Sequence, residues 1–159
     1  VFFASPALSA VKELKSNNKK AVILPSVSSV DSMWSDLCID PGSDGCCMFE
    51  ATDFLISKRI FDKRSHLVLL QVGVIGGNDL KLKENANILQ GYLGEFYPQT
   101  HPVTVYEASV IPGHPPRIET LILRDLSQSR LTKISTLYVS PCEKAEYDKD
   151  VIDRILSND

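Results

Sequence analysis

The sequence has no marked excess of one charge and no long hydrophobic run. Its 159 residues include 17 lysines and arginines and 20 aspartates and glutamates, for a formal net charge of -3. A surface that binds nucleic acid needs a basic excess facing the phosphates, so we expect no nucleic-acid partner. No apolar stretch approaches the roughly 18 residues of a membrane-spanning helix, and we expect no membrane partner. The opening VFFASPAL lacks the basic start of a signal peptide, which favours a cytoplasmic protein.

Motifs that hold metal ions are also missing. The four cysteines form no C-x-x-C pair, and reduced thiols in a cytoplasmic protein are the favoured interpretation. The three histidines lie in separate segments and form no H-E-x-x-H pattern. We therefore expect no metal site.

The glycines that follow the most apolar segment do not form a phosphate-binding loop. Gly73, Gly76 and Gly77 give G-x-x-G-G, whereas a dinucleotide loop needs G-x-G-x-x-G and a P-loop ends in lysine with serine or threonine. The stretch SHLVLLQVGVIGGNDL is instead predicted to be a buried strand that ends near Gln71 and turns sharply. Because ligands bind beyond the carboxyl ends of strands in open α/β sheets, Gln71 is a candidate binding residue.

The order of the predicted elements indicates an α/β protein. Apolar runs predict strands at residues 21–25, 46–51, 66–72, 101–109, 118–123 and 134–140. Helical spacing predicts helices at residues 7–18, 30–37, 54–59, 80–96 and 144–156. Strands and helices alternate first, and adjacent strands able to pair antiparallel follow. We therefore predict a mixed sheet flanked by helices.

Several polar residues have a structural explanation. Ser28 with Asp31 three residues later resembles a capping box. Thr52 or Asp53 is the predicted cap of the next helix, and Glu107 is predicted to make a hydrogen bond at a strand end. For Asp53 and Glu107 we favour these roles over catalysis.

Small and hydroxyl-bearing residues mark two further strand ends. Ala108 and Ser109 follow Glu107 before a proline-rich loop, and Ser135 with Thr136 begins the last predicted strand. Small residues admit a ligand closely, and hydroxyls supply oriented hydrogen bonds, so an adenosine-like ligand would suit these walls. The alternative, that small residues only ease strand packing, is equally well supported.

Five segments together resemble the tetrapyrrole methylase family: LPSVSSVDSMWSDLCIDP, CMFEATDFLISKR, HLVLLQVG, HPVTVYEASVIP and ISTLYVSP. They cover nearly the whole chain in order. The family contains S-adenosylmethionine-dependent enzymes with two α/β domains and the cofactor between them. The resemblance implies that residues 1–20 end the amino-terminal domain and that residues 21–159 form the carboxyl-terminal domain. The segments SDLCIDP, FEATDFL and QVG are most similar to the borosin branch, whose members methylate peptide backbone nitrogens.

The resemblance also implies a set of contacts with S-adenosylmethionine. The family's P-G-V-S-S loop matches residues 25–29, where Ser26 replaces the usual glycine. The chain opens with an apolar VFFASP that leads directly into a capped helix, and the family's earlier motifs would precede it, so we expect a fragment. In the peptide-methylating branch, the resemblance implies that the catalytic arginine and tyrosines belong to that earlier part, and we name no catalytic residue. The implied cofactor contacts are Phe2, Ser28, Ser29, Gln71, Ser109, Ser135 and Thr136.

The function that this resemblance implies is methyl transfer to a peptide backbone or, as second choice, to a tetrapyrrole. In-line transfer needs proximity and exclusion of water, and a base when the nucleophile is as poor as an amide nitrogen. The family implies a homodimer as well. Two alternatives stay open: a non-catalytic module that binds a ligand or dimerises, and a general α/β nucleotide-binding domain.

Overall fold

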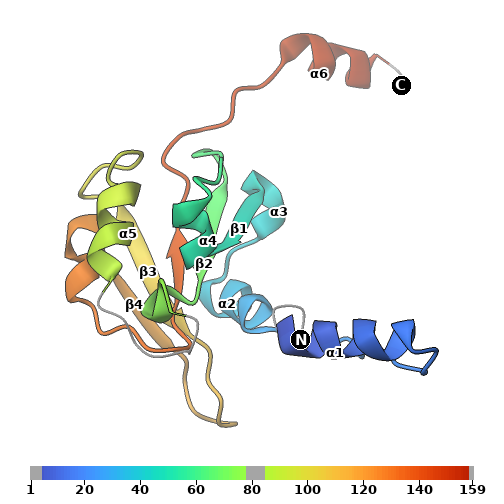
Figure 1. Ribbon diagram of the computed structural model, residues 1–159. Coiled ribbons are helices and arrows are strands. Elements are labelled where there is room, and N and C mark those ends of the chain that lie inside the picture. The colour runs from blue at the N-terminus through green and yellow to red at the C-terminus, as the bar shows by residue number, and fades with distance from the viewer. Residues whose placement is uncertain (1–4, 78–84, 158–159) are drawn as a thin grey trace. The chain divides into compact units, whose positions relative to one another are not determined.

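The computed structural model of the chain describes residues 5–77 and 85–157 (Figure 1). The chain divides into two compact units, residues 1–39 and residues 40–159. Within the described ranges, no helix has the length and apolar character needed to cross a membrane. The predicted domain boundary after residue 20 stays a prediction.

The first unit contains two helices, α1 (Ser5–Ser16) and α2 (Ser29–Leu37). Both were expected from the sequence. The capping box before α2 is confirmed, because the backbone N–H of Asp31 donates to the Ser28 hydroxyl at 3.2 Å and the Ser28 backbone N–H donates to the Asp31 carboxylate at 2.8 Å. Such a cap stabilises a helix by about 1 kcal/mol.

The prediction of a strand at residues 21–25 is wrong. The segment forms no strand, and Val22 and Leu24 are 78% and 75% exposed. A run of aliphatic residues favours a strand only where a partner strand lies beside it, and composition cannot supply that partner.

The second unit is built on one mixed sheet of five strands in the order β1-β2-β5-β3-β4, which confirms the predicted architecture. β1 pairs with β2 in parallel, and the other neighbouring pairs are antiparallel. The strands are β1 (Cys46–Glu50), β2 (His66–Leu70), β3 (Pro102–Glu107), β4 (Arg117–Ile122) and β5 (Thr136–Val139).

Short helices lie before, between and after these strands in the chain. The predicted helix at residues 80–96 is α5, which begins at Ala86, and residues 80–84 of that prediction lie outside the described residues. The helical elements are α3 (Pro41–Asp44), α4 (Ala51–Ile56), α5 (Ala86–Leu93), α6 (Lys149–Leu156) and two 3₁₀ helices, η1 (Val72–Val74) and η2 (Leu123–Gln128).

The cap of α4 differs from the prediction. Glu50 caps the helix, because its carboxylate accepts a hydrogen bond of 2.7 Å from the Asp53 backbone N–H. The helix starts directly where β1 ends, so the capping position falls on the last residue of the strand. Thr52 instead accepts from the backbone N–H of Gly76 at 3.0 Å, and Asp53 pairs with Arg59 at 2.7 Å.

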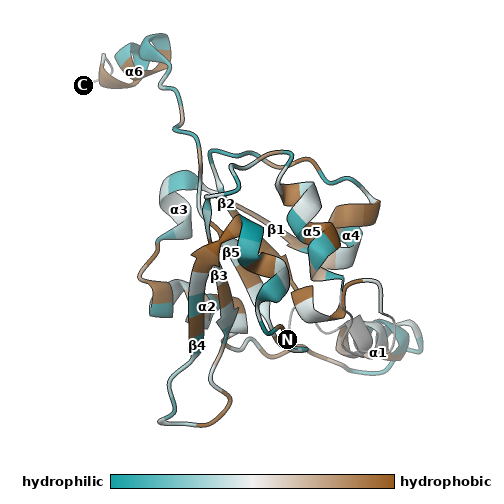
Figure 2. Cartoon of the chain, turned by 90° about the vertical axis from the view of Figure 1, so that its left-hand side faces the viewer, coloured by the Kyte–Doolittle hydropathy of each residue, from teal (hydrophilic) through white to brown (hydrophobic). Residues whose placement is uncertain are grey.

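The hydrophobic core lies between the sheet and the helices α4 and α5. The strands are largely hydrophobic (Figure 2), and Leu69, Leu137 and Val105 lie side by side across β2, β5 and β3 with no exposed surface. Each such side chain contributes about 1.5–3 kcal/mol through burial. Phe54 of α4 adds an edge-on contact with Tyr92 of α5, with 5.4 Å between ring centroids. This packing fixes the strand ends that carry the candidate site.

Candidate functional site

The ends of all five strands meet at one edge of the sheet, which we call the strand edge. β1 and β2 are parallel, so both end there, at Glu50 and Leu70. β5 is antiparallel to β2 and begins there at Thr136, while β3 ends and β4 begins there as the pair Glu107 and Arg117. The topology thereby gathers residues from distant parts of the sequence.

Gln71 follows β2 directly at this edge. Its backbone adopts a left-handed conformation with φ 61° and ψ 34°, and its side chain is exposed. Such a conformation costs a residue other than glycine about 1–2 kcal/mol. The strand therefore ends at Leu70, two residues before the predicted end at residue 72.

The backbone around Gln71 rests on the turn Thr132–Ser135. The Val72 N–H donates to the Ser135 carbonyl at 3.2 Å. Gly73 lies so close to this turn that a Cβ atom there would stand 2.1 Å from the Thr132 carbonyl oxygen. Only a residue without a side chain allows this approach.

Glu107 holds the same turn from the other side. Its Oε1 accepts hydrogen bonds from the Ser135 hydroxyl at 2.6 Å, the Thr132 hydroxyl at 2.8 Å and the Arg117 guanidinium at 3.0 Å. Partial burial raises the pKa of Glu107, but the hydrogen bonds from Ser135 and Thr132 and the charge of Arg117 outweigh it, so the pKa lies below the ordinary 4.5. Glu107 is therefore ionised, and its predicted role in hydrogen bonding at a strand end is confirmed.

The Arg117 guanidinium extends this network across β4. Its Nη1 also donates to the Arg130 carbonyl at 2.6 Å, and its Nη2 pairs with the Glu119 carboxylate. The Ser129 hydroxyl donates to Glu119 at 3.0 Å. These bonds join β3, β4 and the segment 129–135 into one hydrogen-bonded unit.

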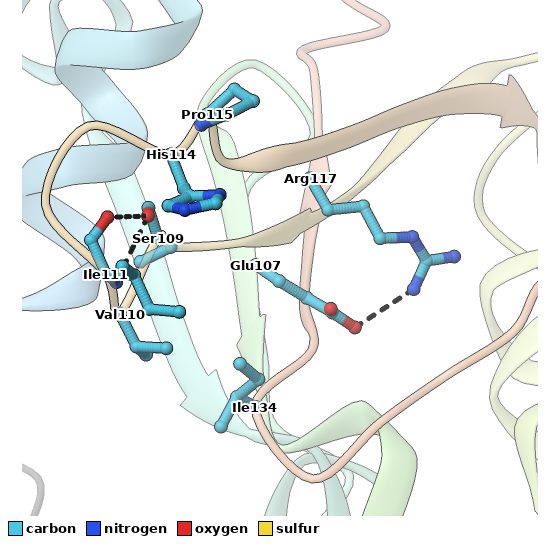
Figure 3. A pocket seen from close by; sticks show the side chains of 9 residues that line it. Glu107, Ser109, Val110, Ile111, His114, Pro115, Arg117 and Ile134 are labelled. Atoms are coloured by element: carbon cyan, nitrogen blue, oxygen red, sulfur yellow. Dashed lines mark hydrogen bonds and ion pairs between the residues drawn. The ribbon is translucent and has the colours of Figure 1, made fainter.

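A pocket of about 260 Å³ opens beside Glu107 (Figure 3). Its walls are mostly apolar, with the ion pair of Glu107 and Arg117 on one side. The loop after β3 forms the other side, where the Ser109 hydroxyl donates to the Ile111 carbonyl at 2.9 Å. The pocket is lined by Glu107, Ala108, Ser109, Val110, Ile111, His114, Pro115, Arg117 and Ile134.

Four of the predicted cofactor contacts lie near the strand edge. Gln71, Ser135 and Thr136 are brought together by the bond from Val72 to the Ser135 carbonyl, and Ser109 follows the end of β3. Ser135 has no exposed surface, and its hydroxyl both accepts from the Thr132 N–H at 2.7 Å and donates to Glu107. Of these four residues, Gln71 and Ser109 are exposed, whereas Ser135 and Thr136 are buried.

The remaining predicted contacts lie elsewhere in the sequence. Ser28 and Ser29 belong to the first unit, where Ser28 is the helix cap. Phe2 lies outside the described residues. The assignment of all seven residues to a cofactor stays a prediction.

Sequence reasoning missed four side chains of the network: Arg117, Glu119, Ser129 and Thr132. Arg117 lies opposite Glu107 because the register between β3 and β4 pairs them. No local sequence pattern predicts that register. Within residues 5–77 and 85–157, no group of three or more side chains of the types that bind metal ions lies together.

Solved structures share this fold. The methyltransferase CobJ superposes with a TM-score of 0.64 and 15% identity, over 91% of this chain and 61% of its own. Uroporphyrin-III-C-methyltransferase from Thermus thermophilus gives a TM-score of 0.58 and 18% identity, over 87% and 55%. A structure of uroporphyrin-III C-methyltransferase from the same organism, complexed with S-adenyl homocysteine, gives 0.56 and 15%, over 87% and 60%. The fold is that of the tetrapyrrole methyltransferases.

In sequence, the chain is similar to the borosin methyltransferases. The chain is 37% identical over 158 residues to the methyltransferase and lentinulin A precursor of Lentinula edodes, covering 94% of this chain and 38% of that protein. It is 35% identical over 161 residues to the methyltransferase and omphalotin A precursor of Omphalotus olearius, covering 96% and 39%. A type III borosin precursor of Anomoporia bombycina is 35% identical over 147 residues, covering 87% and 17%.

These findings confirm the resemblance that the sequence motifs indicated. The chain is a relative of the borosin methyltransferases and has the tetrapyrrole methyltransferase fold. It spans less than two fifths of the length of the curated relatives from Lentinula edodes and Omphalotus olearius. No protein-family model matches the chain.

Proposed function

We propose that the protein is an S-adenosylmethionine-dependent methyltransferase that modifies backbone amides of a peptide. The observation that carries the proposal is the match of 94% of the chain, at 37% identity, to a protein named as both a methyltransferase and a cyclic peptide precursor. The fold that it shares with a methyltransferase complexed with S-adenyl homocysteine supports the choice of cofactor. Methylation of a tetrapyrrole is the second candidate, and the structural neighbours favour it.

The strand edge is the part of the second unit that we assign to the cofactor. When bound, S-adenosylmethionine supplies a methyl group on a sulfonium, which is reactive without further activation. The protein's task is to bind and orient it and to exclude water. The Gln71 amide offers a donor and an acceptor, and Ala108 and Ser109 allow close approach. The implied contacts Thr136 and Ser135 lie at the same edge, with Ser28, Ser29 and Phe2 as further proposed contacts.

Glu107 is a poor choice for the base that a peptide amide needs. Its Oε1 already accepts three hydrogen bonds, and its pKa lies below the ordinary value, which weakens it as a proton acceptor. We therefore assign no proton transfer to Glu107 and keep it as a structural carboxylate.

We further propose that the protein is a homodimer. The helix α6 supports this, because Val151, Ile152, Ile155 and Leu156 are all at least 39% exposed. Positions 151 and 155, like 152 and 156, are four residues apart and share one face of the helix. Light scattering on the full-length protein should give twice the mass of one chain, and an Ile155→Lys variant should shift the mass toward that of one chain. A single-chain mass for the unmodified protein would refute the dimer.

A cytoplasmic location is part of the proposal. The four cysteines, all in the described part of the chain, form no disulfide bond, which is usual where thiols are kept reduced. Fractionation of the source cells with an antibody to the protein should place it with cytoplasmic markers, and recovery from the secreted fraction would contradict this.

The cofactor assignment is tested by calorimetric titration of S-adenosylhomocysteine into the full-length protein. We expect saturable binding at one site per chain, with ATP as the control ligand. Absence of binding would refute the methyltransferase proposal, and equal binding of ATP would favour a general nucleotide-binding domain. Mass spectrometry then decides the substrate: increments of one methyl group on a peptide, with none on a tetrapyrrole, are expected. Binding without methylation of either substrate would favour a non-catalytic module.

A further inference from the structure

We propose that Glu107 is a positioning residue that holds the turn on which the Gln71 backbone rests, and so keeps the strand edge in the form that binds the cofactor. The inference deepens the proposed function and rests on it, because it assumes that this edge meets S-adenosylmethionine. Glu107 would touch no reacting atom.

The first step is the hold of Glu107 on the turn. The Ser135 and Thr132 hydroxyls both donate to Glu107 Oε1, at 2.6 and 2.8 Å, and the Thr132 N–H donates to the Ser135 hydroxyl at 2.7 Å. The two hydroxyls thus point at one carboxylate oxygen. Because hydrogen bonds to a charged acceptor are roughly twice as strong as neutral ones, the charge on Glu107 is the centre of this arrangement.

The second step leads from the turn to Gln71. The Ser135 carbonyl accepts from the Val72 N–H, and the Thr132 carbonyl lies against Gly73, where no Cβ would fit. Gln71 is held in its left-handed conformation between β2 and these two contacts. A shift of the turn would release a strained residue, which would then relax to an ordinary conformation.

The third step separates Glu107 from its neighbour Glu119. Both carboxylates pair with the Arg117 guanidinium. Glu119 accepts from the Ser129 hydroxyl, whereas only the Glu107 carboxylate is bonded to the hydroxyls of Thr132 and Ser135 in the described network. Glu119 therefore serves as a matched control with the same ion-pair partner.

The experiment compares Glu107→Gln with Glu119→Gln in the full-length protein. Glu107→Gln should weaken calorimetric binding of S-adenosylhomocysteine about tenfold, the effect of losing a charge-assisted hydrogen bond, whereas Glu119→Gln should change it less than about twofold.

A second readout needs no ligand. The Val72 amide should exchange its proton with solvent faster in Glu107→Gln than in Glu119→Gln or in the unmodified protein, because its acceptor lies on the released turn. General loss of stability would instead speed the exchange of core amides in both variants. If Glu107→Gln fails to fold, Thr132→Val removes one of the two hydroxyl donors and takes its place.

Several results would overturn the proposal. Unchanged affinity in a folded Glu107→Gln variant, or an equal loss in Glu119→Gln, would exclude a positioning role while leaving the proposed function intact. If the unmodified protein binds no S-adenosylhomocysteine, the proposed function fails, and with it the link from Glu107 to a cofactor. The exchange of the Val72 amide would then still decide whether Glu107 holds the Gln71 backbone.

Discussion

Gln71 combines two properties that substitution can separate: a left-handed backbone with φ 61° and an exposed amide side chain. Gln71→Gly removes both the backbone strain and the amide. Gln71→Ala removes the amide alone, since alanine pays the same penalty for a positive φ. If the amide contacts the cofactor, both variants lose affinity, but only glycine changes stability.

The expected magnitudes follow from the conformation. Relief of the left-handed penalty favours Gln71→Gly by about 1–2 kcal/mol, and the greater freedom of glycine in the unfolded chain removes about 0.5–1 kcal/mol of that gain. The net change is an increase of up to about 1.5 kcal/mol in the free energy of unfolding. Gln71→Ala should stay within about 0.5 kcal/mol, as exposed substitutions usually do. Loss of one hydrogen bond, about 1 kcal/mol, should weaken S-adenosylhomocysteine binding about fivefold in both variants.

Lys58 supplies a matched control. It is exposed, it has a φ of 45°, and it follows the end of α4, whereas the strand edge lies at the start of that helix. Lys58→Gly should raise the free energy of unfolding by a similar amount and leave the affinity unchanged. Urea unfolding and calorimetric titration of the full-length variants give both quantities.

Two results would refute this reasoning. Unchanged affinity in Gln71→Ala and Gln71→Gly would show that the amide meets no cofactor. A Gln71→Gly variant less stable than the unmodified protein by more than about 1 kcal/mol would show that the side chain packs in the fold, contrary to its exposure.

Three further predictions concern stability, each measured by urea unfolding. The pKa of Glu107 is lowered in the folded protein, so the stability that this carboxylate contributes is present above its unfolded pKa near 4.5 and is lost as the pH falls through the folded pKa. The loss of unfolding free energy in Glu107→Gln, measured first at pH 7, should therefore shrink on acidification. A loss that stays constant with pH would contradict this. Gly73→Ala should destabilise the protein by several kcal/mol, because the added Cβ would meet the Thr132 carbonyl. In Gly91→Ala, in α5, the added Cβ meets nothing within 4 Å, so this variant should be more stable by up to about 1 kcal/mol. Equal effects of the two substitutions would refute the close approach at Gly73. Ser28→Ala should cost about 1 kcal/mol through loss of the cap on α2, and no loss would argue against the capping box.

The parts of the fold that were predictable depend on local interactions. The cap of α2 is visible in the sequence because Ser28 and Asp31 are three residues apart and bond to each other's backbone. The apolar run of β2 identifies a buried strand because its residues are covered on both faces. Five strands of the sheet could be recognised in this way, whereas their order, with β5 between β2 and β3, could not.

The failures have the opposite cause. Residues 21–25 have the composition of a strand but lack a partner strand. Glu50 replaced Thr52 and Asp53 as the cap because helix α4 starts at Ala51, three residues before the predicted start at residue 54. In both cases the outcome depends on how the chain passes from one element to the next. Propensity is a weak guide there, since tertiary pairing and the exact start of an element outweigh it.

The sequence by itself determined the α/β class, the resemblance to the tetrapyrrole methylases and the place of Gln71 at a strand end. Those conclusions rest on local patterns and motifs, which need no knowledge of distant contacts. Only the tertiary structure decided that Ser135 is buried against Glu107, that Arg117 joins them, and that Gln71 is held in a left-handed conformation. These features arise from strand order and register, which bring together residues far apart in the chain.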